Sequence, residues 1–201
     1  MDYIEKDFSK RGKSVKLCLI APAPQHCGGI SNWTRIVCKQ IEKEKSKIEF
    51  SFINIAPTTS CLERRVGLGY LWTSSRELFI QLKNLLHQIK ISRPDIIHLT
   101  TSGGMSFIRD YVLTNVMKRF DIPFVYHIHF GRVPQIIENR KIEYWIMSRV
   151  LSRAYRVIAI DPKTYECFQK QFPSVKSVYI PNPVEKSEFM GKDIQSKKEI
   201  L

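Results

Sequence analysis

Residues 15–37, VKLCLIA-PAPQHCGG-ISNWTRIV, decide the fold that this sequence predicts. The first seven residues are an apolar run of the length that is typical of a buried strand. Two prolines and two glycines then mark a loop, because these residues interrupt regular structure. Apolar residues recur beyond the loop at the spacing of one helix face, which predicts a helix over residues 30–45.

The alternation of strand and helix continues along the chain. Further strands are predicted at residues 48–55, 96–99, 124–129, 156–160 and 175–180. Further helices are predicted at residues 74–91, 102–119, 138–153 and 162–170. The pattern predicts an α/β fold, a Rossmann-like, open and mostly parallel sheet with helices on both faces. In the helix at 138–153 we expect five apolar side chains to face inward, namely Ile142, Trp145, Ile146, Val150 and Leu151.

The chain of 201 residues suits one domain with short extensions. We assign residues 1–14 to a flexible leader, residues 15–185 to the Rossmann-like domain and residues 186–201 to a linker or tail. The five cysteines are odd in number and form no C-x-x-C pair, which favours free thiols in a reducing cytoplasm. No secretory signal is visible, and no run approaches the ~20 apolar residues that span a bilayer. We therefore expect a cytoplasmic protein, with a peripheral place on the inner face of the membrane as an alternative.

The chain is strongly basic, with a formal net charge of +13, and most of the excess lies between residues 17 and 185. A basic body favours an anionic partner, which could be a membrane surface, a phosphorylated substrate or nucleic acid. Charge alone does not choose among them. Because no recognised nucleic-acid-binding motif is present, we do not expect nucleic acid.

Ligands of open parallel sheets bind beyond the carboxyl ends of the strands, so the loops that follow the strands are the informative ones. Gly28 and Gly29 lie between the first strand and its helix. Glycines allow a ligand to approach the backbone, and a helix start offers unpaired N–H groups to an anion such as phosphate. A tight turn that needs glycine explains the pair equally well.

His127 and His129 end the fourth strand, and strand periodicity places both on one face. Such histidines can donate a hydrogen bond to a substrate or handle a proton. By themselves they are more often half-buried side chains that the backbone satisfies. No convenient third ligand lies nearby, so we predict no metal site. Arg132 and Lys163 follow the fourth and fifth strands and could contact phosphate oxygens, although solvated side chains are the commoner case.

Taken in order, these loops resemble the amino-terminal domain of family 4 glycosyltransferases. The matching stretches are CGGI (27–30), RPDIIH (93–98), PFVYHIHFG (123–131), RVIAID (156–161) with Lys163, and VYIPNPV (178–184). The resemblance covers roughly residues 15 to 185. Asp161 stands where relatives often have Ser, and Thr100 stands where a second histidine is common.

The resemblance implies a GT-B fold, in which two Rossmann-like domains enclose the active site and the amino-terminal one holds the acceptor. It implies that His129 touches the donor sugar near the reacting carbon, with His127 as its neighbour. Gly28 and Gly29 would approach the donor diphosphate, and Arg132 and Lys163 would contact anions. It also implies transfer with retained anomeric configuration, without bound metal or cofactor, and with a nucleotide-sugar as co-substrate.

We therefore expect the acceptor-binding half of a hexosyltransferase that acts on a polysaccharide or glycolipid, with a saccharide or lipid-linked acceptor. Relatives continue into a donor-binding domain, whereas this chain ends at Leu201. We expect it to be inactive without that domain, supplied by a missing half or a partner chain. The alternative is a non-catalytic module that docks on an anionic membrane or on a partner in a polysaccharide-synthesis complex.

Overall fold

The computed structural model describes residues 14–43, 47–56 and 68–183, with side chains described from residue 73 in the last range. The leader assigned to residues 1–14, Ser14 apart, and the tail assigned to residues 186–201 lie outside the described residues. Those two boundaries therefore stay predictions.

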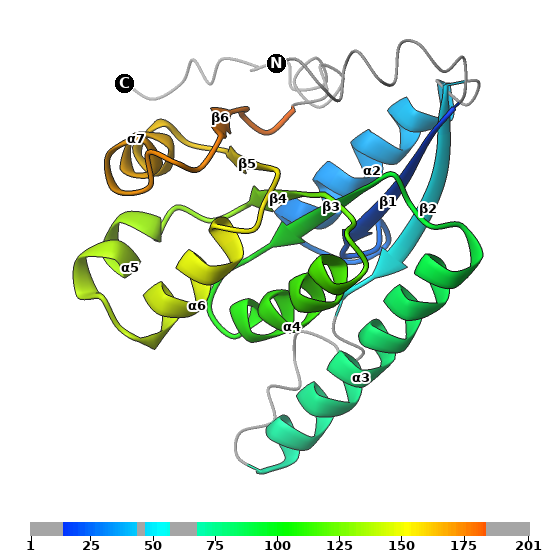
Figure 1. Cartoon of the computed structure of the whole chain (residues 1–201), viewed down its shortest axis with the longest axis horizontal. Coiled ribbons are helices and arrows are strands. Elements are labelled where there is room, and N and C mark those ends of the chain that lie inside the picture. Colours follow the sequence, from blue (N-terminus) through cyan, green and yellow to red (C-terminus); the bar gives the residue numbers. More distant parts are fainter. Residues whose placement is uncertain (1–13, 44–46, 57–67, 184–201) are drawn as a thin grey trace, which may run out of the picture.

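The centre of the molecule is a six-stranded sheet in which every neighbouring pair of strands is parallel. The strands lie in the order β2-β1-β3-β4-β5-β6, which confirms the predicted Rossmann-like α/β fold (Figure 1). Their bounds are β1 (Val15–Ala21), β2 (Ile48–Asn54), β3 (Ile96–Thr101), β4 (Phe124–Ile128), β5 (Arg156–Ala159) and β6 (Ser177–Tyr179). Pro181, Asn182 and Pro183 follow the short edge strand β6.

Helices cover both faces of the sheet, as predicted. They are α2 (Gly29–Lys43), α3 (Leu68–Ile91), α4 (Ser106–Arg119), α5 (Val133–Asn139), α6 (Ile142–Leu151) and α7 (Pro162–Gln171). Figure 1 shows α2 on one side of the sheet and α4 and α6 on the other. The chain reverses direction after β2, because it returns past β1 to form β3. With right-handed crossovers, this reversal places α2 on the face opposite to the helices that follow.

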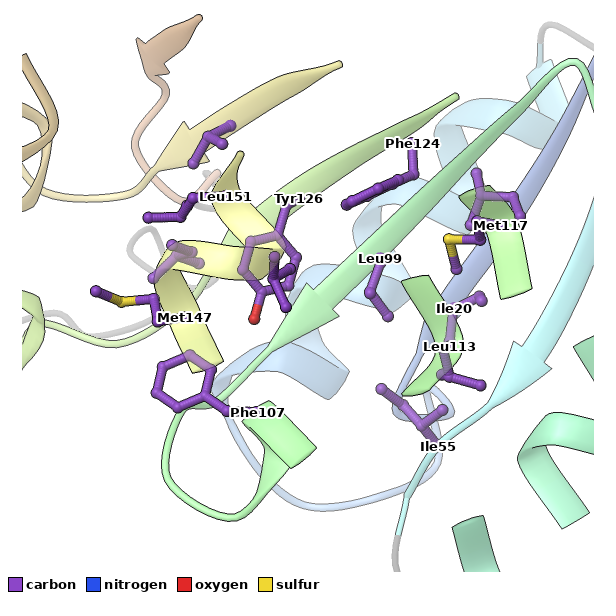
Figure 2. Close-up of a cluster of buried hydrophobic side chains, with 14 of the residues drawn as sticks. Ile20, Ile55, Leu99, Phe107, Leu113, Met117, Phe124, Tyr126, Met147 and Leu151 are labelled. Carbon is purple, nitrogen blue, oxygen red and sulfur yellow. The ribbon is translucent and has the colours of Figure 1, made fainter. Parts of the chain in front are cut away.

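The hydrophobic core is divided by the sheet into two unequal parts. Alternate strand residues such as Ile20, Leu99 and Tyr126 belong to a large cluster with side chains of α3, α4, α6 and α7 (Figure 2). The intervening residues Leu19 and Ala21 form a smaller cluster with α2. We call these two sides the hydrophobic face and the α2 face. The period of two along each strand thus sends successive residues into different environments.

The segment predicted as one helix at residues 138–153 consists of two helices, α5 and α6. Arg140 has a left-handed φ of 47°, and its N–H donates to the Ile136 carbonyl, which ends α5. The prediction that Ile142 and Trp145 face inward is wrong, because they are 74% and 62% exposed. The predicted inward positions of Val150 and Leu151 are confirmed, and Ile146 packs partly buried against the core. The sequence therefore identified the buried second half of α6 but misplaced two side chains near its start.

The loop after β3 also differs from its prediction. β3 extends through Thr101, and Thr100 donates its hydroxyl to the Ile20 carbonyl at 3.2 Å. The next helix begins at Ser106 instead of residue 102. Gly103 and Gly104 have φ values of +76° and +61°, and these left-handed conformations cannot lie inside a right-handed helix.

Candidate functional site

Three imidazoles gather on the α2 face beneath one tryptophan. His98 comes from β3, His127 from β4 and His129 from the residue after β4. The Trp33 ring of α2 lies 5.3, 4.9 and 5.0 Å from the three imidazoles, measured between ring centroids. We call the three histidines the imidazole cluster. His127 and His129 thus share one face, as strand alternation predicted.

The cluster is held together by direct contacts. His98 Nε2 and His127 Nδ1 are 3.1 Å apart and share a hydrogen bond. The rings of His127 and His129 lie 3.9 Å apart with an interplanar angle of 36°. Among the described residues, His127 Nε2 and both ring nitrogens of His129 are buried without a hydrogen-bond partner. Such unsatisfied polar atoms cost free energy and are therefore often kept for function.

Burial keeps the cluster uncharged. It lowers the pKa of His98 to about 4, of His127 to about 2 and of His129 to about 4. Asn182 faces the His129 ring and opposes part of the shift in its pKa, although the two side chains do not meet with good hydrogen-bond geometry. At neutral pH each ring is therefore neutral, with one N–H donor and one acceptor. The cluster therefore has unused hydrogen-bonding capacity and no positive charge.

Gly28 and Gly29 lie at the start of α2 with free space in front of them. No atom comes within 4 Å of the position that a Cβ would occupy at either residue. Gly28 has a φ of +129°, which other residues rarely adopt. The amides of the first helical turn have no partner within the helix, so they are available to a ligand.

Trp33 connects the helix start to the imidazole cluster. It lies four residues after Gly29, so the two occupy the same side of α2 about 5–6 Å apart. The same tryptophan packs on His129. The structure therefore places Gly29 on the same side of α2 as Trp33, whose ring contacts the ring of His129.

This place is also where the topology of the sheet reverses. β1 and β3 are neighbours, yet the chain leaves them toward opposite faces of the sheet. Such a reversal opens a crevice at the carboxyl ends of the two strands, the usual ligand site of this architecture. The exits of β3 and β4 are tied together, because the His129 N–H donates to the Thr101 carbonyl at 3.0 Å. The backbone of His129 is thereby fixed at the rim.

The end of β3 is supported from the hydrophobic face by a buried polar network. Asp110 is fully buried, and its carboxylate pairs with Arg109 at 2.6 Å. The hydroxyl of Tyr126 donates to the same carboxylate at 2.8 Å, and burial raises the pKa of Tyr126 well above its usual value. Arg109 also donates to the Thr100 carbonyl at 3.3 Å. Sequence reasoning missed this network, since one Asp in an amphipathic helix gives no signal of burial.

The two predicted cations lie further out. Arg132 is exposed and occupies the N-cap position of α5, three residues after His129, without a capping hydrogen bond from its side chain. Lys163 is exposed in the first turn of α7, after β5. No hydrogen bond or ring contact within the described part of the chain joins either residue to the imidazole cluster. Asp161 is the N-cap residue of α7, because its carboxylate accepts a 2.8 Å hydrogen bond from the Thr164 N–H.

Sequence reasoning also missed two contacts of the site. Neither Trp33 nor His98 was among the site residues predicted from the sequence. Their positions depend on how α2 crosses the sheet and how β3 pairs with β4. Within the described ranges, no three His, Cys, Asp or Glu side chains are grouped so that they could hold a metal ion.

The fold is that of one Rossmann-like domain of a GT-B glycosyltransferase. The structure is similar to Glycyrrhiza uralensis UGT73P12 complexed with glycyrrhetinic acid 3-O-monoglucuronide, with a TM-score of 0.50 and 10% identity. The alignment covers 84% of this chain and 49% of that one, so this chain spans about half the length of that enzyme. Residues 42–188 match the model of Glycosyltransferase Family 4. The chain belongs to this family.

Two further comparisons add little. A conserved protein from Enterococcus faecalis V583 aligns over 73% of this chain and 92% of its own, at 11% identity and a TM-score of 0.37, too low to support an argument. No curated protein sequence matches the chain. Among the helices in the described ranges, none is long and apolar enough to cross a membrane.

Proposed function

We propose that this domain is the acceptor-binding half of a retaining hexosyltransferase, which moves a hexose from a nucleotide-sugar to a polysaccharide or glycolipid acceptor. Membership of the family supports glycosyl transfer in general. The observation that supports the finer proposal is the contact of Trp33, four residues after Gly29 on α2, with the buried ring of His129. Backbone amides and a neutral imidazole at one rim suit a sugar bonded to a diphosphate.

The start of α2 would receive the donor diphosphate. Unpaired N–H groups and the positive end of the helix dipole favour an anion there. They would stabilise the negative charge that develops on the diphosphate as it leaves. The open space at Gly28 and Gly29 supports this role, because a larger side chain would occupy the path of the ligand.

His129 would hold the sugar at the reacting carbon. Its two ring nitrogens are unpartnered among the described residues and its pKa is about 4. A neutral imidazole can donate one hydrogen bond to a sugar hydroxyl and accept another. His127 stacks beside it and is oriented by His98, so we assign His127 to fixing the position of the His129 ring.

The remaining wall of the cleft would come from a donor-binding domain, on the same polypeptide or on a partner chain. It would hold the nucleotide and exclude water during transfer, and the domain described here would not catalyse transfer without it. No cofactor or metal is needed in this scheme, and the nucleotide-sugar is a co-substrate. Arg132 and Lys163, both exposed beyond the strand ends, would meet anionic groups of the ligands.

Replacement of His129 tests the proposal. In the protein complemented with its donor-binding domain, His129→Ala should lower the kcat of sugar transfer by roughly 10²-fold or more. His87→Ala is the matched control, because His87 is exposed on α3, away from the rim. Release of nucleoside diphosphate from a panel of nucleotide-sugars gives the rate, and circular dichroism checks the fold. Unchanged turnover in a folded His129→Ala protein would show that His129 has no catalytic role.

A second function is favoured by one observation, the exposed Ile142 and Trp145 of α6. In that case the domain would dock on a membrane or partner without catalysing transfer. Binding that persists while no donor supports turnover in the complemented protein would favour this docking function.

A further inference from the structure

We propose that the outer surface of α4 and α6 binds the face of a lipid bilayer that contains anionic headgroups. This docking surface consists of Met105, Ile108 and Tyr111 on the α4 side and Ile142, Trp145 and Arg149 on α6. The inference rests on the docking function proposed above and deepens it, because it names an anionic bilayer as the partner. It uses residues that take no part in the imidazole cluster.

The apolar members of the docking surface are exposed to an unusual degree. Ile142 and Trp145 are 74% and 62% exposed, and Met105 and Ile108 are 55% and 44% exposed. Ile108 and Tyr111 on α4, and Ile142 and Trp145 on α6, are three residues apart, which places each pair on one side of its helix. A contiguous group of large apolar side chains at the surface of a water-soluble fold marks an interaction site.

The two helices that carry the docking surface are neighbours. α4 and α6 pack against each other. The guanidinium of Arg153, just after α6, lies 5.0 Å from the centre of the Tyr111 ring of α4. Its hydrogen bond lowers the pKa of Tyr111, and the charge of Arg149 acts in the same direction. Tyr111 of α4 is therefore in contact with the chain just after α6.

The charges around the docking surface are mainly positive. Arg140 and Lys141 precede α6 and are exposed, and Arg149 is exposed in its last turn. Glu143 is the one acidic residue of α6. The one acidic residue of α4, Asp110, is buried and paired with Arg109. An exposed apolar centre with a cationic border is complementary to anionic headgroups above acyl chains.

The residue types favour a bilayer over a protein partner. Trp and Tyr have an apolar body with a polar edge, and Arg has an apolar stem with a charged end. Helices with this mixture lie in the interface plane of membranes. Met105 belongs to the loop after β3, so the docking surface begins near the exits of the strands. A bilayer bound there would bring a lipid-linked acceptor close to the crevice.

Vesicle flotation of the full chain tests the proposal. Phosphatidylcholine vesicles that contain phosphatidylglycerol should retain the wild-type protein at low salt, and pure phosphatidylcholine vesicles should retain much less. Trp145→Ser should weaken retention roughly tenfold, because burial of that ring would be lost. Arg149→Glu should weaken it by a similar factor and reduce its salt dependence. Phe79→Ser is the matched control, because Phe79 is an equally exposed aromatic residue on α3.

Three results would overturn the inference. The first is wild-type protein that anionic vesicles do not retain. The second is an equal loss of retention in Phe79→Ser and Trp145→Ser, which would indicate nonspecific adsorption. The third is sedimentation of the wild type as a dimer that Trp145→Ser dissociates, without vesicle binding, which would assign the surface to a second copy. None of these readouts depends on sugar transfer, so this inference and the proposed function can fail separately.

Discussion

The two faces of the sheet are built from neighbouring residues of the same strands, yet they do different things. Leu99, Tyr126 and Ile128 point to the hydrophobic face and are fully buried among apolar side chains. Their neighbours His98 and His127 point to the α2 face. There the two imidazoles contact each other, and His127 Nε2 has no hydrogen-bond partner among the described residues. Buried polar atoms without partners cost about 1–3 kcal/mol each. The comparison indicates that the hydrophobic face stabilises the domain while the α2 face gives up stability for a binding site.

The largest expected effect is a loss of stability on the hydrophobic face. Leu99 is fully buried in the core. Leu99→Ala should therefore lower the free energy of unfolding by about 2–5 kcal/mol. His98→Ala, one residue away on the other face, should cost much less. Urea unfolding of both variants measures the difference. Equal losses of unfolding free energy in the two variants would contradict the proposed difference between the two faces.

A smaller effect is expected at the rim where the faces meet. A Cβ at Gly103 would lie 2.9 Å from the Phe130 ring, and its φ is +76°. Gly103→Ala should therefore cost about 1–3 kcal/mol in unfolding free energy, from backbone strain and crowding together. Gly104→Ala is the control, with a similar φ of +61° and no atom within 4 Å. A smaller loss of unfolding free energy at Gly104 than at Gly103 would measure the contribution of crowding against Phe130. Identical losses would show that crowding contributes nothing.

The smallest expected effect is a dependence of stability on pH that belongs to the α2 face. The pKa of His98 falls from 6.5 to about 4 on folding, chiefly through burial. The unfolded chain therefore binds the proton more readily, and stability is lost as the pH falls from about 6.5 toward 4. When the pH falls from 7 to 5, the free energy of unfolding of His98→Leu should decrease by roughly 1–2 kcal/mol less than that of the wild type. Urea unfolding at both pH values tests this, and equal losses in the two proteins would contradict it.

The sequence predicted the strands well, since strands buried on both sides of a parallel sheet appear as short apolar runs. It predicted the buried second half of α6 correctly but wrongly placed Ile142 and Trp145 inward, because these two are apolar in type and exposed in the fold. The break at Arg140 was also missed. A left-handed φ is typical of glycine, and nothing in an Arg signals it.

The candidate site was predictable in part. Alternation along one strand places His127 and His129 together, and loop position selects Gly28 and Gly29. The role of Trp33 depends on the angle at which α2 crosses the sheet. The His98–His127 contact depends on the register of β3 and β4, in which His98 lies opposite Val125 and Thr100 opposite His127. Both are tertiary relations that residue types alone do not encode.

The short strand β6 has a consequence for how the protein behaves at high concentration. An unpaired strand at the border of a sheet is a template on which another chain can add a strand. Here that border is three residues long and is followed by Pro181 and Pro183, which have no N–H to donate. Growth of the sheet across this border into fibrils or strand-swapped oligomers is thereby blocked within a few residues.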